Sequence, residues 1–550
     1  MKLRCAFVAV LIASSFSAPA FAQSADAEYS IAGIVVDSVT GNPIRRAELS
    51  TILNREEVST FSDESGRFRL DHLQPGKYQL YASAPAYVRQ GLNQHGSFFT
   101  GVVTGNGLDS EHITFRIHPQ ALIRGRITDQ NGEPVRNASV NLFAIANRVG
   151  QLPSMQAQQQ TNDLGEYRFA HLLAGKYCVA VQAQPWYAQG GFNYVPVEPE
   201  TASFRGLSRG PRGKPDPSLD VVYPLTFSPG VTDERSASEI SVAEGETAEA
   251  NIPMRTVPAA HLRLTGMPAD HSLNVNVFQK VFGTVAMPLS IQTSEISPSE
   301  IEIAGLPPGD LTFAINRANT DEKERTIQAN VSGSGTLDAS RPLPSAKVSG
   351  RVFLPEGSGT IGDAGIMLVK DGEPATFTRL HKDGSFDLGA LPLDTYHIFL
   401  NIPGEPKFFQ KLTASGARVN GHDVVLTGVN DVDLTIVLGG GFSTISGIAM
   451  LNNRGVDGVM VLLVPDSGAN LDDDSRMDQS DSDGSFQLGG IIPGKYRLVA
   501  IQDGWGLDWR APAVLKPYLE KAEVLQISAR EARKITVEVQ KRIGSAVAAN

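Results

Sequence analysis

The sequence predicts an all-β protein, a tandem array of about five β-sandwich domains. Three observations predict this fold class. One segment recurs five times along the 550 residues, and apolar and polar residues alternate with a period of two in and around each copy. The chain also contains 53 Gly and 33 Pro, which provide turn signals between the alternating runs. A recurrent segment of this kind indicates one structural unit per copy.

The recurrent segment aligns without gaps in all five places. Its copies are DESGRFRLDHLQPGKYQL from Asp63, NDLGEYRFAHLLAGKYCV from Asn162, ISPSEIEIAGLPPGDLTF from Ile296, HKDGSFDLGALPLDTYHI from His381 and DSDGSFQLGGIIPGKYRL from Asp481. The spacing predicts a strand, a corner and a second strand, with the aromatic residue after the corner facing inward. Four copies have a turn glycine that is expected to take a positive φ, namely Gly66, Gly165, Gly384 and Gly484.

Two further patterns flank the recurrent segment. Openings such as GIVVD from Gly33 and GRITD from Gly125 indicate an edge strand followed by a tight turn and a second strand. Closing segments such as ISVAEGETAEANIPM, LTGVNDVDLTIVL and LQISAREARKITVEV indicate hairpins that end in an alternating strand. Together the patterns give about seven strands per unit, which is the expectation for a β-sandwich.

These repeats divide the chain into domains. The predicted boundaries are 1–22 signal peptide, 29–118 sandwich one, 119–257 sandwich two with an insertion at 184–232, 258–343 sandwich three, 344–440 sandwich four, 441–543 sandwich five and 544–550 tail. Sandwich three is degenerate, because Ser299 replaces the turn glycine and no clear opening pattern precedes it.

The combination of motifs resembles a known family. G-x-V-x-D, then G-x-P-[IV]-x-x-A, then D-x-x-G-x-F and L-x-P-G-x-Y are similar to the carboxypeptidase regulatory-like domain. That domain is a transthyretin-like (prealbumin-like) sandwich, related in pattern to collagen-adhesin B-type repeats and starch-binding-like modules. The resemblance covers units one, two, four and five well and unit three weakly. It implies an all-β fold and a bacterial surface or periplasmic setting, and it implies no hydrolytic activity.

The N-terminus predicts export. Lys2 and Arg4 precede an apolar run from Ala6 to Ile12, and the small-residue pattern ending at Ala22 is typical of a signal-peptide cleavage site. The apolar run is too short to span a membrane. We therefore expect a protein that is exported to the periplasm or the extracellular space and has no membrane span.

Cysteine content and charge narrow the function classes. After loss of Cys5 with the signal peptide, Cys178 stands alone in the alternating run YCVAVQA, where we expect it to be buried. The formal net charge of −11 disfavours a nucleic-acid partner. No cofactor is expected, and the oligomeric state is left open.

The insertion at 184–232 stands out by composition. It is rich in aromatic residues, Gly, Pro and basic residues, a composition suited to a sugar-binding platform because a pyranose has one apolar face and a rim of hydroxyls. Trp186 and Trp505 both lie eleven residues after a corner glycine, so packing at equivalent sandwich ends competes with a binding role. Phe192, Tyr194 and Trp509 lack that equivalence and are the better candidates for ligand binding.

Catalytic and metal signatures are weak. GLSRG, from Gly206 to Gly210, lies in a Pro-rich loop rather than on a strand-to-helix elbow, and the ten histidines contain no HExxH. We therefore expect no enzyme activity. The acidic loop LDDDSRMDQSDSDG offers weak Ca²⁺ candidates, Asp472, Asp474, Asp481 and Asp483, for which a solvated loop is the competing interpretation.

We expect the protein to act either in binding or as a structural scaffold. The first hypothesis is a non-enzymatic binding protein for a carbohydrate or another cell-surface polymer, with a polysaccharide or a surface protein as partner. The alternative is a structural spacer or adhesion scaffold on the bacterial surface. A more distant alternative is an accessory domain protein of a peptidase system.

Overall fold

The computed structural model describes residues 28–53, 55–145, 153–188, 217–266, 273–283, 285–297, 299–317, 325–340, 344–355, 361, 363–370, 373–468 and 471–543. The predicted signal peptide, the tail and most of the aromatic insertion lie outside these residues. The regular secondary structure of the described residues is almost entirely β-strand, which confirms the predicted array of sandwiches.

Units one and two each consist of two sheets around an apolar core. The strands of unit one are β1 (Tyr29–Asp37), β4 (Arg67–Leu73) and β9 (Ile113–Ile117), facing β2 (Glu48–Leu53), β3 (Glu56–Phe61), β6 (Tyr81–Ser83) and β7 (Gln90–Gly91), with β5 (Gly76–Tyr78) paired to β8 (Val102–Thr104). The strands of unit two are β10 (Ala121–Thr128), β13 (Glu166–Leu172), β18 (Thr247–Glu249) and β19 (Ile252–Pro253), facing β11 (Ser139–Ile145), β12 (Ser154–Gln160), β14 (Gly175–Gln182), β16 (Thr226–Phe227) and β17 (Ile240–Val242). A short pair, β15 (Val221–Val222) and β20 (Val257–Pro258), leads from unit two into unit three.

Units three and four repeat this plan. The strands of unit three are β21 (Ala260–Thr265), β24 (Gln292–Ser297), β25 (Glu300–Leu306) and β28 (Gly335–Asp338), facing β22 (Leu273–Val281), β23 (Val285–Leu289), β26 (Gly309–Arg317) and β27 (Arg325–Val331). The strands of unit four are β29 (Ser345–Phe353), β32 (Ser385–Pro392), β34 (Lys407–Ser415) and β37 (Val432–Gly440), facing β30 (Gly365–Lys370), β31 (Glu373–Arg379), β33 (Thr395–Asn401), β35 (Arg418–Asn420) and β36 (Asp423–Val425).

Unit five differs because its two layers share a strand. Its elements are β38 (Ser443–Leu451), β39 (Arg454–Gly455), β40 (Met460–Pro465), α1 (Leu471–Asp474), β41 (Arg476–Gln479), β42 (Ser485–Ile491), β43 (Gly494–Gln502), α2 (Pro512–Leu519), β44 (Glu523–Ile527) and β45 (Ala532–Lys541). The first part of β45 pairs with β38 and its end pairs with β43, so β45 joins the layers into one continuous sheet.

The opening strand of every unit is a central strand, which corrects the edge strand that the sequence predicts. In unit one, β1 pairs antiparallel with β4 on one side and parallel with β9 on the other. The same parallel pairing of opening and closing strands recurs in units two to five. The glycine of the opening motif fits this position, because a Cβ on Gly33 would lie 2.0 Å from the carbonyl oxygen of Ile113 in β9.

The closing segments are strands but not hairpins. β17 pairs with β14, whereas β18 and β19, which follow it, pair with β10 in the opposite sheet. β44 likewise pairs with β43, and β45 crosses to β38. Alternation correctly identifies the strands, but the partner of each strand depends on which layer its apolar face must cover.

A β-bulge recurs where each opening strand meets the strand after the glycine turn. The register shifts in all five units. In units one and two the backbone there passes through His72 (φ 62°) and His171 (φ 59°), whereas units three and five have Gly305 and Gly490. Since a positive φ is costly for most side chains, its recurrence supports a common backbone plan even in the degenerate unit three.

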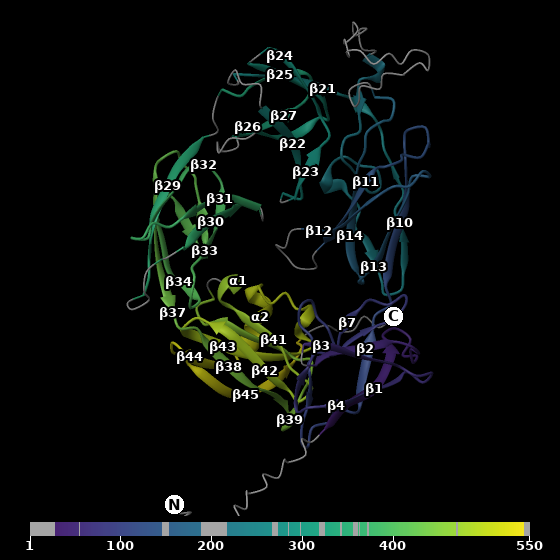
Figure 1. The fold of residues 1–550 in the computed structure, drawn as a ribbon, viewed down its shortest axis with the longest axis vertical. Helices are drawn as coiled ribbons and strands as arrows, with labels where there is room; N and C mark the ends of the chain where they lie inside the picture. The colour runs from purple at the N-terminus through teal and green to yellow at the C-terminus, as the bar shows by residue number, and fades with distance from the viewer. Residues whose placement is uncertain are drawn as a thin grey trace, which may run out of the picture.

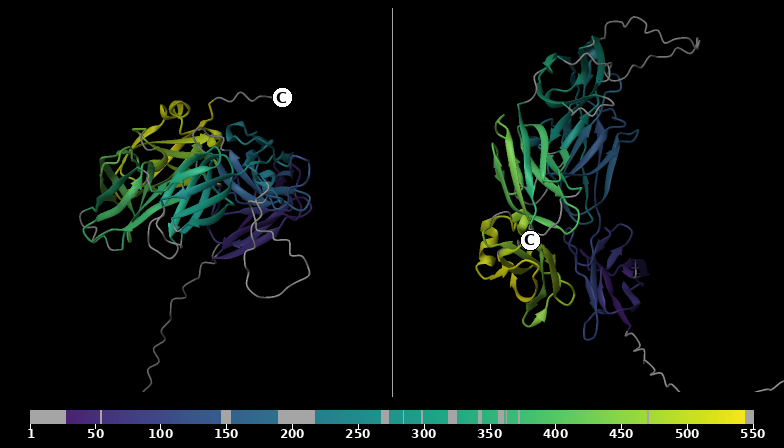
Figure 2. Two further views of the ribbon diagram at one scale, coloured as in Figure 1. Left: turned by 90° about the horizontal axis from the view of Figure 1, so that it is seen from above. Right: turned by 60° about the vertical axis from the view of Figure 1, so that its left-hand side comes forward.

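The chain turns back on itself. Figure 1 shows that it rises from unit one through unit two to unit three at the top, and then descends through unit four to unit five beside unit one. The views in Figure 2 show the same bent path rather than a straight rod. Hydrogen bonds between residues more than 360 positions apart join the first and fifth units, so the five units form a closed ring.

Candidate functional site

The contact that closes the ring is built around Trp505. Its indole stacks on the imidazole of His95 from unit one, with ring centroids 5.0 Å apart and planes 7° apart. Phe98 lies against the same indole at 5.4 Å, and the indole N–H donates to the carbonyl of Gly458 at 2.9 Å. Trp505 therefore packs between two units, and its ring is not an open platform for a ligand.

Buried and part-buried hydrogen bonds surround this aromatic contact. The side-chain amide of Gln479, at the end of β41, donates to the carbonyl of Asn93 at 2.7 Å and to the hydroxyl of Thr100 at 2.9 Å. Ser482 exchanges two further bonds with the other unit, since its N–H donates to Gly101 O at 2.9 Å and its hydroxyl accepts from Val103 N at 2.8 Å. Residues 93–103 of unit one are therefore hydrogen-bonded to unit five in a way that resembles the addition of a β-strand to a sheet edge.

A buried carboxylate lies at the centre of this network. Asp481 accepts a hydrogen bond from the backbone N–H of Gly101 at 2.9 Å and pairs with Lys77 at 2.7 Å. Only 4% of the Asp481 side chain is exposed, whereas 48% of the Lys77 side chain is exposed. Burial raises the pKa of Asp481 above its usual value, and the hydrogen bond and charge of Lys77 offset only part of that shift.

The local fold explains how Asp481 reaches this place. Asp481 begins the fifth copy of the recurrent turn, whose glycine, Gly484, has a φ of 83° as predicted. The equivalent residues of units one, two and four, Asp63, Asn162 and His381, are exposed. The turn is therefore common to these units, but only in unit five does it face another unit.

Trp186 has a different environment from Trp505, although both follow their corner glycines by eleven residues. It is 84% exposed, and its nearest aromatic partner is Tyr187, in an edge-to-face contact at 5.7 Å. The Tyr187 hydroxyl accepts a hydrogen bond from Gln130 at 3.0 Å, which ties this corner to the β10–β11 turn of unit two. Phe192 and Tyr194, the neighbouring candidates from the sequence, lie outside the described residues.

Trp509 corrects a prediction from the sequence. It is only 4% exposed and packs with Leu515 and Tyr518 of α2 against strands β40 and β43. The guanidinium of Arg510 lies 4.3 Å from its ring centre. A sugar could not stack on this ring without displacing the helix, so Trp509 is a packing residue.

The four aspartates predicted as weak Ca²⁺ candidates have separate environments. Asp481 binds Lys77 and Gly101, and Asp483 accepts from the N–H of Ser485 at 2.9 Å. Asp472 and Asp474 lie in α1, and the side chain of Asp472 is outside the described residues. Among the described side chains, one group with metal-ligand spacing converges, and it comprises His397, His422 and Asp473. Sequence reasoning missed this group because its members are up to 76 positions apart and belong to two units.

The junction between units two and three is apolar. It is formed by Phe143, Cys178, Ala180, Leu225, Phe227, Val281 and Met287. Cys178 is buried there, and burial raises the pKa of its thiol to about 12. A thiol with so high a pKa is almost entirely protonated at neutral pH, so Cys178 is not a candidate nucleophile.

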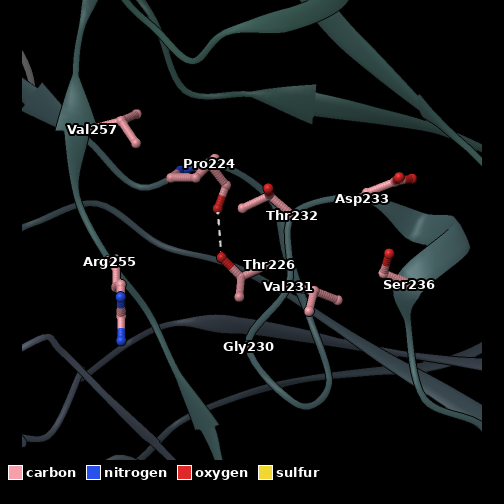
Figure 3. Close-up of a pocket in the computed structure, with 9 residues that line it drawn as sticks. All are labelled: Pro224, Thr226, Gly230, Val231, Thr232, Asp233, Ser236, Arg255 and Val257. Atoms are coloured by element: carbon pink, nitrogen blue, oxygen red, sulfur yellow. Dashed lines mark hydrogen bonds between the residues drawn. The ribbon is translucent and has the colours of Figure 1, made fainter.

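A shallow pocket of about 340 Å³ lies on unit two and is lined in part by the C-terminal end of the insertion at 184–232 (Figure 3). Its lining includes Thr226, Thr232, Asp233, Ser236 and Arg255. The Thr226 hydroxyl donates to the Pro224 carbonyl at 2.9 Å, so part of the polar lining is already satisfied within the chain. The lining contains no aromatic residue, and a stacking platform for a sugar is therefore not formed by this pocket.

None of the helices in the described part of the chain has the length and apolar character needed to cross a bilayer.

Comparison with known proteins identifies the sandwich type of the first two units. Residues 30–96 and 122–203 match the carboxypeptidase regulatory-like domain, so units one and two carry the domain that their motifs predict. No curated protein matches the chain.

The solved structures to which the chain shows similarity include several pilins. The Streptococcal ancillary pilin is 10% identical, with 57% of this chain and 99% of that chain covered and a TM-score of 0.20. BcpA, the major pilin subunit of Bacillus cereus, is also 10% identical, with 75% and 100% covered and a TM-score of 0.15. GBS52, the minor pilin of Streptococcus agalactiae, is 13% identical, with 38% and 100% covered and a TM-score of 0.17. Similarities this low carry no functional conclusion for this chain.

Proposed function

We propose that this protein is an exported, non-catalytic scaffold that presents the Trp186 corner of unit two to a carbohydrate or another cell-surface polymer, in the periplasm or outside the cell. The observation that carries the proposal is the exposure of Trp186, 84% of whose surface is accessible to solvent. Tryptophan is enriched at binding interfaces, because its ring supplies a large apolar contact surface together with a polar N–H group.

The contrast among the three tryptophans supports this assignment. Trp505 is covered by His95 and Phe98, and Trp509 is covered by α2. Trp186, in a T-shaped contact with Tyr187, is 84% exposed. Such a ring offers a flat apolar surface for a pyranose, and the Tyr187 and Gln130 pair beside it offers polar groups for hydroxyls.

The closed ring supports the scaffold part of the proposal. A rod-like spacer would separate its ends, whereas here units one and five are joined by hydrogen bonds and an aromatic stack. A ring restricts the motion of its members relative to one another, so a binding corner on unit two is held on a rigid frame. Preorganisation of this kind lowers the entropic cost of binding.

The test is retention of the mature chain on an array of bacterial and plant polysaccharides. The wild type should be retained on at least one polymer, and Trp186→Ala should weaken retention at least about tenfold because it removes the stacking surface. Phe377→Ala, which removes a 58% exposed aromatic residue from unit four, is the matched control and should bind like the wild type.

The double variant Phe192→Ala/Tyr194→Ala tests, in the same assay, the prediction from the sequence that these two aromatic residues bind the ligand. Unchanged melting curves establish that each variant is folded. Retention by Trp186→Ala equal to that of the wild type, or no retention of the wild type on any polymer, rejects carbohydrate binding at this corner.

A further inference from the structure

Three potential metal ligands meet where unit four touches unit five. His397 lies in β33, His422 directly precedes β36, and Asp473 lies in the one-turn helix α1 of unit five. One ligand atom from each residue lies within 4.8 Å of the others. Figure 1 shows α1 on the side of unit five that faces β33 and β34.

The two histidines are held in place by neighbours that leave nitrogen atoms for a metal. His397 pairs with Asp423 across the β33–β36 ladder, and its Nδ1 lies 2.8 Å from the Asp423 carboxylate. A carboxylate bonded to one imidazole nitrogen fixes the ring and increases the basicity of the other nitrogen, which is the usual support for a metal-binding histidine.

His422 is positioned by packing and by its backbone. Its ring lies 4.2 Å from the ring of Phe409, and its carbonyl accepts a hydrogen bond from Ile398 N at 3.0 Å. Its Nδ1 is 3.5 Å from the Asp473 carboxylate of unit five. The side chains of His397, His422 and Asp473 are 33%, 22% and 30% exposed, so an ion could reach them from solvent.

The spacing fits a small transition-metal ion. Ligands at about 2.0–2.1 Å from a tetrahedral Zn²⁺ lie about 3.4 Å from one another. The separation between His422 and Asp473 already has this value within about 0.1 Å. The other separations in the group must close by at most about 1.4 Å, which side-chain rotation can supply. Two imidazoles and one carboxylate select Zn²⁺ and similar ions over Ca²⁺ or Mg²⁺, which prefer all-oxygen sites.

We propose that His397, His422 and Asp473 bind one Zn²⁺ ion, with water completing the coordination, and that this ion fastens unit four to unit five. The site is independent of the proposed carbohydrate-binding corner, which lies on unit two. Because its ligands come from both units, the bound ion stabilises the junction and hence the ring.

The experiment measures Zn²⁺ uptake by the tag-free mature chain at pH 7.5, in competition with a chromophoric chelator. The wild type should bind one Zn²⁺ tightly. His422→Ala should weaken this affinity at least about 100-fold, because it removes a direct ligand. Asp423→Ala should weaken it about tenfold or more, the effect expected for a residue that orients a ligand. His112→Ala, which removes an exposed histidine of unit one, should have no effect.

A second measurement separates metal binding from a purely structural role. Zn²⁺ should raise the melting temperature of the wild type but not that of Asp473→Ala, whose two histidine ligands remain on unit four. Affinity should also fall as the pH is lowered toward 5.5, since imidazole must be neutral to bind metal. If an alanine variant does not fold, His397→Gln, which also removes a proposed ligand, is tested in its place. Absence of Zn²⁺ binding by the wild type at micromolar concentrations, or equal affinity in His422→Ala, overturns the proposal.

Discussion

The junction between units two and three and the junction between units five and one hold the ring together by different chemistry. The first is a cluster of buried apolar side chains, among them Phe143, Phe227 and Val281. The second combines one aromatic stack with the hydrogen bonds of Gln479 and Ser482 and the buried Asp481. Units two and three are neighbours in sequence, whereas the residues that join units five and one are more than 360 positions apart.

This difference indicates that the two junctions have different roles. Burial of apolar surface contributes a large stabilising free energy and requires no specific geometry. Units two and three should therefore behave as one body. A contact made of hydrogen bonds and a buried charge specifies one geometry but yields less net free energy, because each polar group also loses its water. We therefore expect the ring to open first at the contact between units five and one.

The largest effect is expected at the apolar junction. Phe227→Ala removes a ring that is 2% exposed and should lower the free energy of unfolding by about 3–5 kcal/mol. Urea unfolding of the mature chain measures this change. Phe377→Ala, at an exposed position, should change it by no more than about 0.5 kcal/mol. Equal effects of the two variants would contradict the assignment of Phe227 to a buried junction.

A smaller effect is expected from Trp505→Ala. The change removes the stack on His95, the contact with Phe98 and the hydrogen bond to Gly458. Because the indole is only partly buried, we expect a loss of about 2–3 kcal/mol. Small-angle X-ray scattering should show a larger radius of gyration, since units one and five separate. An unchanged radius would show that Trp505 does not hold the ring closed.

The pH dependence of the closing contact follows from Asp481. Its pKa in the folded protein is raised by burial, so the folded state holds this proton more tightly than the unfolded state. The contribution of this group to stability therefore falls as pH rises from its usual pKa through the raised value.

Comparison of the wild type with Asp481→Asn isolates this contribution. The Asn side chain does not ionise in this pH range. The free energy of unfolding of the wild type, relative to that of the variant, should therefore increase as the pH is lowered from 7 to 4. Urea unfolding at several pH values measures the difference, and a difference that is constant with pH would contradict the prediction.

The smallest effect is expected from Lys77→Met. The Lys77 side chain is half exposed, so its pair with Asp481 is partly screened by solvent and should contribute about 0.5–1 kcal/mol. The variant should also be less sensitive to added salt than the wild type. A loss of several kcal/mol would mean that the pair is more deeply buried than the structure indicates.

Much of the fold is predictable from the sequence because it depends on local rules. The positive φ of Gly66 and Gly165 follows from their place in the turn, and the period-two alternation identifies the strands. The partners of the strands are not local. The segments that contain β17 to β19 and β44 to β45 have the alternation of a hairpin, yet they cross between layers because the opening strand needs a parallel partner.

The candidate sites are less predictable because they depend on how the units are oriented. Trp186 and Trp505 follow the same spacing, but one is exposed and the other is covered by unit one. Asp481 resembles the turn residues of the other units, and nothing in the sequence around it indicates that it is buried. His397 and His422 become potential metal ligands only when α1 of unit five brings Asp473 beside them.

Closure of the ring is tested most directly by chemical cross-linking across the junction of units one and five. The side chains of Asn93 and Asp457 are hydrogen-bonded at 3.2 Å at the surface of this junction, so Cys residues at these two positions would lie within reach of one another. A short bismaleimide should link Asn93→Cys to Asp457→Cys within one chain, and should not link Asn93→Cys to Ser332→Cys on unit three, while the buried Cys178 stays unreacted. Efficient linkage of the first pair alone is the predicted result. Failure of that pair to link, or equal linkage of both pairs, would contradict a closed ring.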